Sequence, residues 1–192
     1  SFSLNLKSKI MLFKDCNIIW VTGLSGSGKT TLARRITEIL NERGIQTIML
    51  DGDDLRMILG SYQFNIKNNH EIESRIEIGL FYSRLCQFLR SKGLNIVIST
   101  ISMYKKVQDW NKENLINYQE VYLEVPLDEL KKRDPKGIYK KFKLGKLSNI
   151  AGLDLPVNEP DNPRWHFKYN QKLEPDRMAE IIINDLYSSE NN

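Results

Sequence analysis

Short apolar runs and longer amphipathic stretches alternate along most of this chain. Runs rich in Ile, Val and Leu have the length of buried strands, and they cover residues 17–22, 47–50, 94–99 and 119–125. Between and after these runs, apolar residues recur three or four positions apart, as in helices that bury one face; these stretches cover residues 29–43, about 71–92, about 105–115, 127–133 and about 175–186. Strands that alternate with helices in this way predict an α/β fold, with a parallel sheet and helices on both of its faces.

Residues 134–164 interrupt this alternation, because glycine and proline are spread through them. A loop of this length inside a compact domain is usually functional, so we expect a lid. Much of the positive charge lies around the start of this segment, at Lys131, Lys132, Arg133, Lys136, Lys140, Lys141 and Lys143. A basic lid that closes over phosphate groups is one interpretation of this cluster, and a solvated helix face is the other.

The overall composition is that of an ordinary soluble globular protein. A length of 192 residues suffices for one domain, which we expect at residues 17–192, after an N-terminal extension at 1–16. Nucleic-acid-binding proteins usually concentrate more positive charge on one face than the net charge of +4 of this chain. The apolar runs are too short for a membrane span and no signal peptide is visible, so we expect a cytoplasmic enzyme that binds neither nucleic acid nor membrane.

The sequence from Gly23 to Thr30 fits the phosphate-binding pattern G-x-x-x-x-G-K-[ST]. Its glycines allow a tight turn that points successive backbone N–H groups inward, at the positive end of the helix that follows. Lys29 can then reach the β- and γ-phosphates of ATP, and the Thr30 hydroxyl can ligate Mg²⁺. The predicted ATP-binding residues of this loop are Gly23, Ser25, Gly26, Ser27, Gly28, Lys29, Thr30 and Thr31.

A second motif, Asp51-Gly52-Asp53-Asp54-Leu55-Arg56, follows the second predicted strand. In an open α/β sheet, ligands bind at the carboxyl ends of the strands. Phosphoryl transfer to a hydroxyl group needs a carboxylate that orients or deprotonates the acceptor and cations that balance the charge; Asp53 and Arg56 can serve these purposes. A helix N-cap formed by Asp53 or Asp54, beside a solvated arginine, is the simpler alternative.

With these two motifs the chain resembles the adenylylsulfate kinase family, and the resemblance extends over residues 17–186. It is strengthened by Ile101-Ser102 after the third strand and by the string R-D-P-K-G-I-Y-K-K at 133–141. The spacing of several lid residues agrees as well, namely Gly152, Asp154, Pro156, Pro160 and Pro163. The resemblance implies a P-loop kinase with ATP as phosphoryl donor and Mg²⁺ as its metal, acting on the 3′-hydroxyl of a nucleoside 5′-phosphosulfate.

The resemblance also implies roles for single residues. Asp53 would be the base or the acceptor-orienting carboxylate, Asp51 would lie near the metal with Thr30, and Arg133 would lie by the adenine of ATP. The residues implied at the acceptor nucleotide are Asp53, Arg56, Ile101, Ser102 and Lys136. Members of the family are commonly dimeric, so the resemblance implies a homodimer.

The acceptor side departs from the family pattern F-S-x-x-D-R-x-E-N-I-R-R. Asn69 and Ser74 stand where the family has arginines, and Ile72 stands where it has asparagine. The matching positions are Phe64, Glu71 and Arg75. In the lid, Ile150 replaces one of two aromatic residues that sandwich the acceptor's purine. Fewer arginines suit a sulfate less well, and a missing ring removes roughly 1–3 kcal/mol of base stacking.

We therefore expect the acceptor pocket, which includes Phe64, Asn69, Ile72, Arg75 and Ile150, to differ from that of the family. The departures resemble the cytidine diphosphoramidate kinase branch, which serves the phosphoramidate decoration of bacterial capsular polysaccharide. Its acceptor has a smaller pyrimidine base and an amide-bearing terminus instead of a sulfate. A true adenylylsulfate kinase is the alternative within the same class, and a non-catalytic nucleotide-binding module is the alternative from another class.

Overall fold

The computed structural model describes residues 16–60 and 72–187, and the predicted N-terminal extension lies almost entirely outside these ranges. The strands are β1 (Ile18–Thr22), β2 (Thr47–Asp51), β3 (Asn95–Ser99), β4 (Tyr118–Glu124) and β5 (Trp165–Lys168). The helices are α2 (Lys29–Glu42), α3 (Gly52–Leu59), α4 (Ile72–Ser91), α5 (Lys105–Asn114), α6 (Leu127–Arg133), α7 (Ile138–Lys143) and α8 (Pro175–Tyr187), with a 3₁₀ turn η1 at Tyr169–Gln171.

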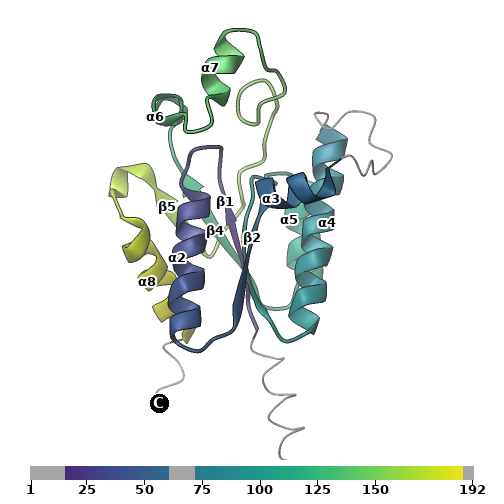
Figure 1. Ribbon diagram of the computed structural model, residues 1–192, viewed down its shortest axis with the longest axis vertical. Coiled ribbons are helices and arrows are strands. Elements are labelled where there is room, and N and C mark those ends of the chain that lie inside the picture. Colours follow the sequence, from purple (N-terminus) through teal and green to yellow (C-terminus); the bar gives the residue numbers. More distant parts are fainter. Residues whose placement is uncertain (1–15, 61–71, 188–192) are drawn as a thin grey trace, which may run out of the picture.

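The strands form one five-stranded sheet in the order β2-β3-β1-β4-β5, and each neighbouring pair is parallel. The carboxyl ends of all five strands therefore lie along the same edge of the sheet. β1 lies at the centre, so the loop that follows it leaves the middle of this edge. Helices α6 and α7 lie beyond the same edge, at the top of the view in Figure 1.

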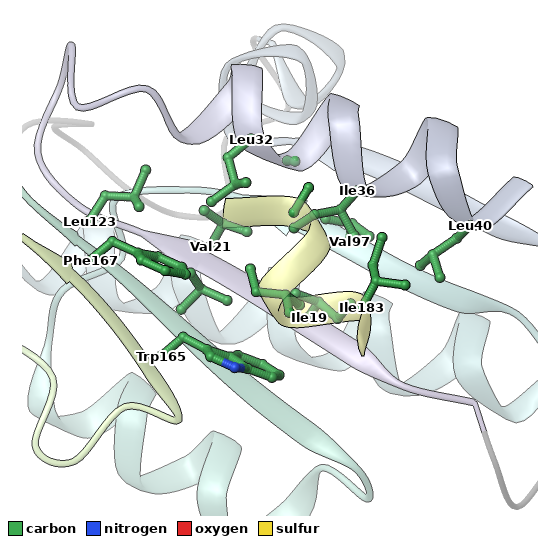
Figure 2. Packing of buried hydrophobic residues seen from close by; sticks show 14 residues of the cluster. Ile19, Val21, Leu32, Ile36, Leu40, Val97, Leu123, Trp165, Phe167 and Ile183 are labelled. Carbon is green, nitrogen blue, oxygen red and sulfur yellow. The ribbon is translucent and has the colours of Figure 1, made fainter. Parts of the chain in front are cut away.

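Alternating residues of β1 point to opposite faces of the sheet and join two apolar clusters. Ile19 and Val21 belong to the cluster that α2 and α8 cover, which Figure 2 shows. Ile18 and Trp20 belong to the second cluster, which α4 and α5 cover on the other face. The prediction of an α/β fold with helices on both faces of a parallel sheet is thus confirmed.

The structure differs from the sequence-based expectations at three elements. Strand β5 was not predicted, helix α3 was considered only as the alternative interpretation of the second motif, and the segment 134–164 contains the short helix α7, where we expected only loop. In β5, Trp165 and Phe167 are buried while His166 and Lys168 are exposed. A run of four residues with this alternation is too short to stand out in the sequence until the neighbouring strand β4 is in place.

Helix α7 begins where the chain reverses after α6. Asp134 has a positive φ of 28° and Gly137 one of 65°, and the Asp134 carboxylate accepts hydrogen bonds from the backbone N–H groups of Tyr139 and Lys140. The aspartate therefore satisfies two N–H groups of the first turn that have no partner within the helix. Among the described helices, none combines the length and the apolar character that crossing a membrane requires.

Candidate active site

The loop between β1 and α2 is packed too tightly for side chains at its first glycine. A Cβ atom on Gly23 would lie 2.6 Å from the Leu123 carbonyl oxygen of β4 and 2.7 Å from the Ser27 Oγ, and its φ is 149°. Gly28, at the start of α2, has φ 97°. This turn leads directly into the N-terminus of α2, where the first backbone N–H groups of a helix have no partner within it and can bind an anion.

Lys29 is the first residue of α2, and its side chain folds back into this loop. Its exposed fraction is 9%, and its Nζ donates a hydrogen bond to the Leu24 carbonyl oxygen at 2.8 Å. The pKa of the Lys29 ammonium is lowered to about 8, mainly by burial and also by the nearby Lys136, while Asp53 and Asp51 oppose the shift. Within the described part of the chain no carboxylate forms an ion pair with Lys29, and a buried cation of this kind is suited to a negatively charged ligand such as a phosphate group.

Three polar side chains from different elements meet beside Lys29. The Thr30 Oγ1 donates to Asp51 Oδ2 at 2.8 Å, and the Ser99 Oγ donates to the same oxygen at 3.1 Å. Asp51 and Ser99 face each other because β2 and β3 are paired in that register. Partial burial raises the pKa of the Asp51 carboxyl, but the hydrogen bonds from Thr30, the Asp53 N–H and Ser99 outweigh it, so the pKa lies below its usual value.

Asp51 also caps α3, since its Oδ1 accepts from the Asp53 N–H at 2.9 Å. The helix N-cap considered in the sequence is therefore present, but Asp51 forms it instead of Asp53 or Asp54. The Asp53 side chain is left exposed at the start of α3, where it makes an ion pair with Lys136 of the segment 134–164. Lys29, Asp51 and Asp53 are close enough that the two carboxylates affect the Lys29 pKa.

These groups line one cleft of about 940 Å³ at the carboxyl edge of the sheet. This volume is near the upper end for small-molecule sites. The predicted site residues that line it are Ser25, Gly26, Gly28, Lys29, Thr30, Thr31, Asp51, Asp53, Arg56, Arg75, Ile101, Arg133, Lys136 and Ile150. The structure thus gathers most of the predicted donor-side and acceptor-side residues around one space.

The other predicted residues lie differently. Gly23 and Ser27 belong to the phosphate-binding loop but are buried. Ile72 packs against the apolar cluster under α4 and α5, and the Ser102 hydroxyl is 2.9 Å from the Thr100 hydroxyl. Phe64 and Asn69 lie outside the described residues.

Some residues of the site were not singled out in the sequence. Ser99 bonds Asp51, and Met49, Thr100 and Asn149 line the cleft. Ser99 could have been found, because it is a polar residue at the carboxyl end of a predicted strand. Asn149 could not, because its place depends on how the segment 134–164 folds back.

On the donor side, the phosphate-binding loop contacts the segment around α6 and α7. The buried Tyr139 donates its hydroxyl to the Ser25 carbonyl oxygen at 2.9 Å. The Arg133 guanidinium donates to the Gly26 carbonyl oxygen at 3.4 Å and lies 5.2 Å from the centre of the Tyr169 ring. The predicted adenine-side residue Arg133 is therefore held next to the loop, stacked on an aromatic ring.

A family model described as adenylylsulphate kinase matches residues 15–168. Cytidine diphosphoramidate kinase of Campylobacter jejuni is 38% identical over 144 residues, which are 75% of this chain and 81% of that protein. A probable adenylyl-sulfate kinase of Pyrococcus abyssi is 35% identical over 165 residues, 86% of this chain and 91% of that protein.

Among solved structures, the Mycobacterium tuberculosis APS kinase in complex with AMPPNP and APS is similar, with a TM-score of 0.78 and 29% identity. The match covers 91% of this chain and 98% of that one. The family model and both relatives extend over most of the sequence, and the fold agrees with the solved structure. The chain therefore belongs to the adenylylsulphate kinase family of ATP-dependent phosphotransferases.

Proposed function

We propose that this protein transfers the γ-phosphoryl group of ATP to the ribose 3′-hydroxyl of a nucleoside 5′-diphosphate-like acceptor, and that this acceptor is cytidine diphosphoramidate. The observation that carries the proposal is the single cleft that joins the buried Lys29 to the exposed Asp53. One end of this cleft suits a triphosphate, and the other offers a carboxylate to an incoming hydroxyl group.

On the donor side, Lys29 and the backbone N–H groups of the loop would hold the β- and γ-phosphates. Thr30 and Asp51 fit a magnesium ion, because a hydroxyl and a carboxylate oxygen lie 2.8 Å apart at the rim of the phosphate site. Magnesium usually binds through one or two carboxylates together with substrate phosphates. A bound ion supplies charge neutralisation at those phosphates.

The two aspartates differ in a way that favours Asp53 as the base. Asp51 already accepts hydrogen bonds from two hydroxyls and a backbone N–H, which stabilise its charged form. Asp53 lines the cleft and pairs with Lys136, whose long side chain is exposed. An acceptor hydroxyl that reaches Asp53 would take the place of the Lys136 ammonium.

In the proposed transfer, the bond that forms is matched by one that breaks. The acceptor oxygen forms a bond to the γ-phosphorus while the bond from that phosphorus to the β,γ-bridging oxygen breaks, and ADP leaves. The hydroxyl proton passes to Asp53, and Lys29 balances the charge that builds on the leaving oxygen. The segment 134–164 would act as a lid that excludes water from the γ-phosphate.

On the acceptor side, the aliphatic Ile150 lines the cleft, where an aromatic ring would stack on a purine. This supports a smaller pyrimidine base, as does the similarity to the Campylobacter jejuni kinase. The similarity to the Pyrococcus abyssi protein and to the Mycobacterium tuberculosis structure favours the second candidate, adenylylsulfate. A cytoplasmic location and a homodimer stay predictions.

The acceptor is identified by measuring ADP release from MgATP with cytidine diphosphoramidate and with adenylylsulfate in parallel. We expect a kcat/KM at least tenfold higher with the cytidine compound. An equal or higher value with adenylylsulfate would overturn the choice of acceptor. Retained ATP binding without turnover of a broad set of nucleotides would instead favour the non-catalytic module.

The role of Asp53 is tested by Asp53→Ala. General-base groups contribute about 10² to 10⁴-fold, so we expect a loss of kcat in this range with little change in the affinity for an ATP analogue. Glu180→Ala is a suitable control, because Glu180 lies on α8 and pairs with Arg177 at the surface. Wild-type turnover by the Asp53 variant would contradict the assignment.

A further inference from the structure

Residues 149–155, here named the acceptor loop, form a small closed turn beside the cleft. Ala151 and Leu155 are bridged, and the Gly152 N–H donates to the Leu155 carbonyl oxygen at 2.9 Å. Asn149, Ile150 and Ala151, at the start of the loop, line the cleft. The position of this loop therefore decides which groups face the acceptor.

The Asp154 carboxylate holds the start of the loop from within. Its Oδ2 accepts from the Asn149 N–H at 2.7 Å, and its Oδ1 accepts from the Ile150 N–H at 2.5 Å. Partial desolvation raises the pKa of the Asp154 carboxyl, but these two hydrogen bonds lower it by more, and Arg75 lowers it further. Both oxygens are used, and both act on the backbone of the residues that line the cleft.

Arg75 of α4 holds the same residues from outside. Its Nη2 donates to the Asn149 carbonyl oxygen at 2.6 Å. The guanidinium also lies near Tyr104, a residue that is 4% exposed; burial raises the pKa of the Tyr104 hydroxyl, and the Arg75 charge opposes that shift. Arg75 therefore spans from a buried tyrosine in the body of the domain to the backbone of the acceptor loop, and its charge lies near Asp154.

A third contact joins the acceptor loop to the phosphate-binding loop. A Cβ atom on Gly152 would lie 2.7 Å from Leu24 Cδ1, so the two loops are in close contact at this glycine. The acceptor loop is thus held on three sides, by α4, by its own aspartate and by Leu24. The first two of these contacts depend on charged side chains that can be changed singly.

We propose that Arg75 and Asp154 are positioning residues, which hold the acceptor loop so that Asn149 and Ile150 meet the base of the acceptor nucleotide. The proposal rests on the phosphoryl-transfer function given above. It gives Arg75 a different role from the one implied by the sequence resemblance, because its guanidinium is engaged by the loop backbone. Neither side chain is needed for ATP to bind.

The test compares Asp154→Asn and Arg75→Met in steady-state kinetics with MgATP and the acceptor that the wild type uses. The asparagine keeps the volume of Asp154 but replaces one acceptor oxygen with an amide NH₂ group. This group is a donor and cannot accept the hydrogen bond of a backbone N–H. For both variants we expect the acceptor KM to rise tenfold or more, while the ATP KM and kcat change less than threefold. Arg75→Lys keeps the charge but not the planar fork, and should fall between Arg75→Met and the wild type.

Asp161→Asn is the matched control. Asp161 belongs to the same segment of the chain and pairs with Lys105 at the surface, away from the acceptor loop. The acceptor KM of the Asp161→Asn variant should equal that of the wild type. An unchanged acceptor KM in Asp154→Asn and Arg75→Met, or an equal rise of the ATP KM and acceptor KM, would overturn the proposal.

A second measurement does not depend on turnover. Trypsin cleavage after Lys146, three residues before the loop, is followed by mass spectrometry under native conditions, with far-UV circular dichroism to confirm folding. We expect cleavage at least fivefold faster in Asp154→Asn and Arg75→Met than in the control. If the wild type uses neither acceptor, the proposed function fails, and cleavage rates equal to the control would then overturn the positioning role as well.

Discussion

At the scale of single residues, Lys29 and Glu120 show that the surroundings of a buried charge decide whether it can bind a ligand or only destabilises the fold. Lys29 lies in a loop that is built to receive anions, so its buried charge is available to a phosphate group. Glu120 of β4 is 4% exposed and lies far along the chain from the site motifs. Its Oε1 accepts from the Tyr118 hydroxyl at 2.9 Å, whereas its Oε2 lies 4.0 Å from the Nζ of Lys112. Ionisation of this buried carboxylate therefore destabilises the fold.

Glu120→Gln should therefore stabilise the protein at neutral pH. Burial raises the pKa of the Glu120 carboxyl above its usual 4.5, while the Tyr118 hydrogen bond and Lys112 oppose the shift and Asp161 adds to it. The folded state thus holds a proton that the unfolded state has lost, and stability declines as pH rises through the folded pKa. Glutamine does not titrate, so its advantage should be about 1 kcal/mol at pH 7 and vanish near pH 4.

Urea unfolding at both pH values measures this difference. Glu113→Gln is the control, because Glu113 is an exposed glutamate on the neighbouring helix α5. A Glu120→Gln effect that is the same at pH 4 and pH 7 would contradict the role given to burial.

At the scale of elements, the phosphate-binding loop is held between two strands and one helix. The loop follows β1 and precedes α2, and the end of β4 packs against Gly23. The loop is short and continuous, so its residue types alone predict its conformation. The acceptor side is different: α3, α4, the end of β3 and the acceptor loop each supply one part of it.

Gly23→Ala should disrupt the phosphate-binding loop on the side that packs against β4. The new Cβ would lie 2.6 Å from the Leu123 carbonyl oxygen, a contact that the backbone of β4 cannot relieve cheaply. We expect a loss of about 1–3 kcal/mol in unfolding free energy and at least a tenfold loss of affinity for an ATP analogue. Unfolding titrations and calorimetric binding measure the two effects.

Gly44→Ala separates steric contact from backbone strain. Gly44 also has a positive φ, of 77°, but no described atom lies within 4 Å of where its Cβ would be, and it ends α2 far from the loop. This variant should lose some stability and bind the analogue normally. Weakened binding in Gly44→Ala, or unchanged binding in Gly23→Ala, would contradict the packing argument.

At the scale of the whole molecule, two apolar clusters hold the sheet between its helices, and the cleft lies beyond the edge of that core. We therefore expect ligands to bind where charges gather, away from the apolar layers. A ligand that binds only the folded state stabilises it by mass action, by about 2.7 kcal/mol at a concentration of 100 times Kd. This links the donor site to global stability.

A non-hydrolysable ATP analogue with Mg²⁺ should accordingly raise the Tm of the wild type. Lys29→Met should abolish this rise, since the buried ammonium is lost, and should stabilise the free protein by about 1–3 kcal/mol, because a desolvated charge is removed. Differential scanning calorimetry with and without the analogue measures both. Lys172→Met, at an exposed position, is the control. A full ligand-induced rise in Lys29→Met would contradict the donor-site assignment.

The sequence by itself determined the features that depend on neighbouring residues. The alternation of apolar runs established the α/β fold, and eight consecutive residues specified the phosphate-binding loop, because turn, N–H groups and lysine are local. The tertiary structure decided what depends on distant parts of the chain. It placed β5 against β4, paired Asp53 with Lys136 and brought Arg75 to Asn149. These contacts join residues up to 83 positions apart, and no local pattern encodes such a distance.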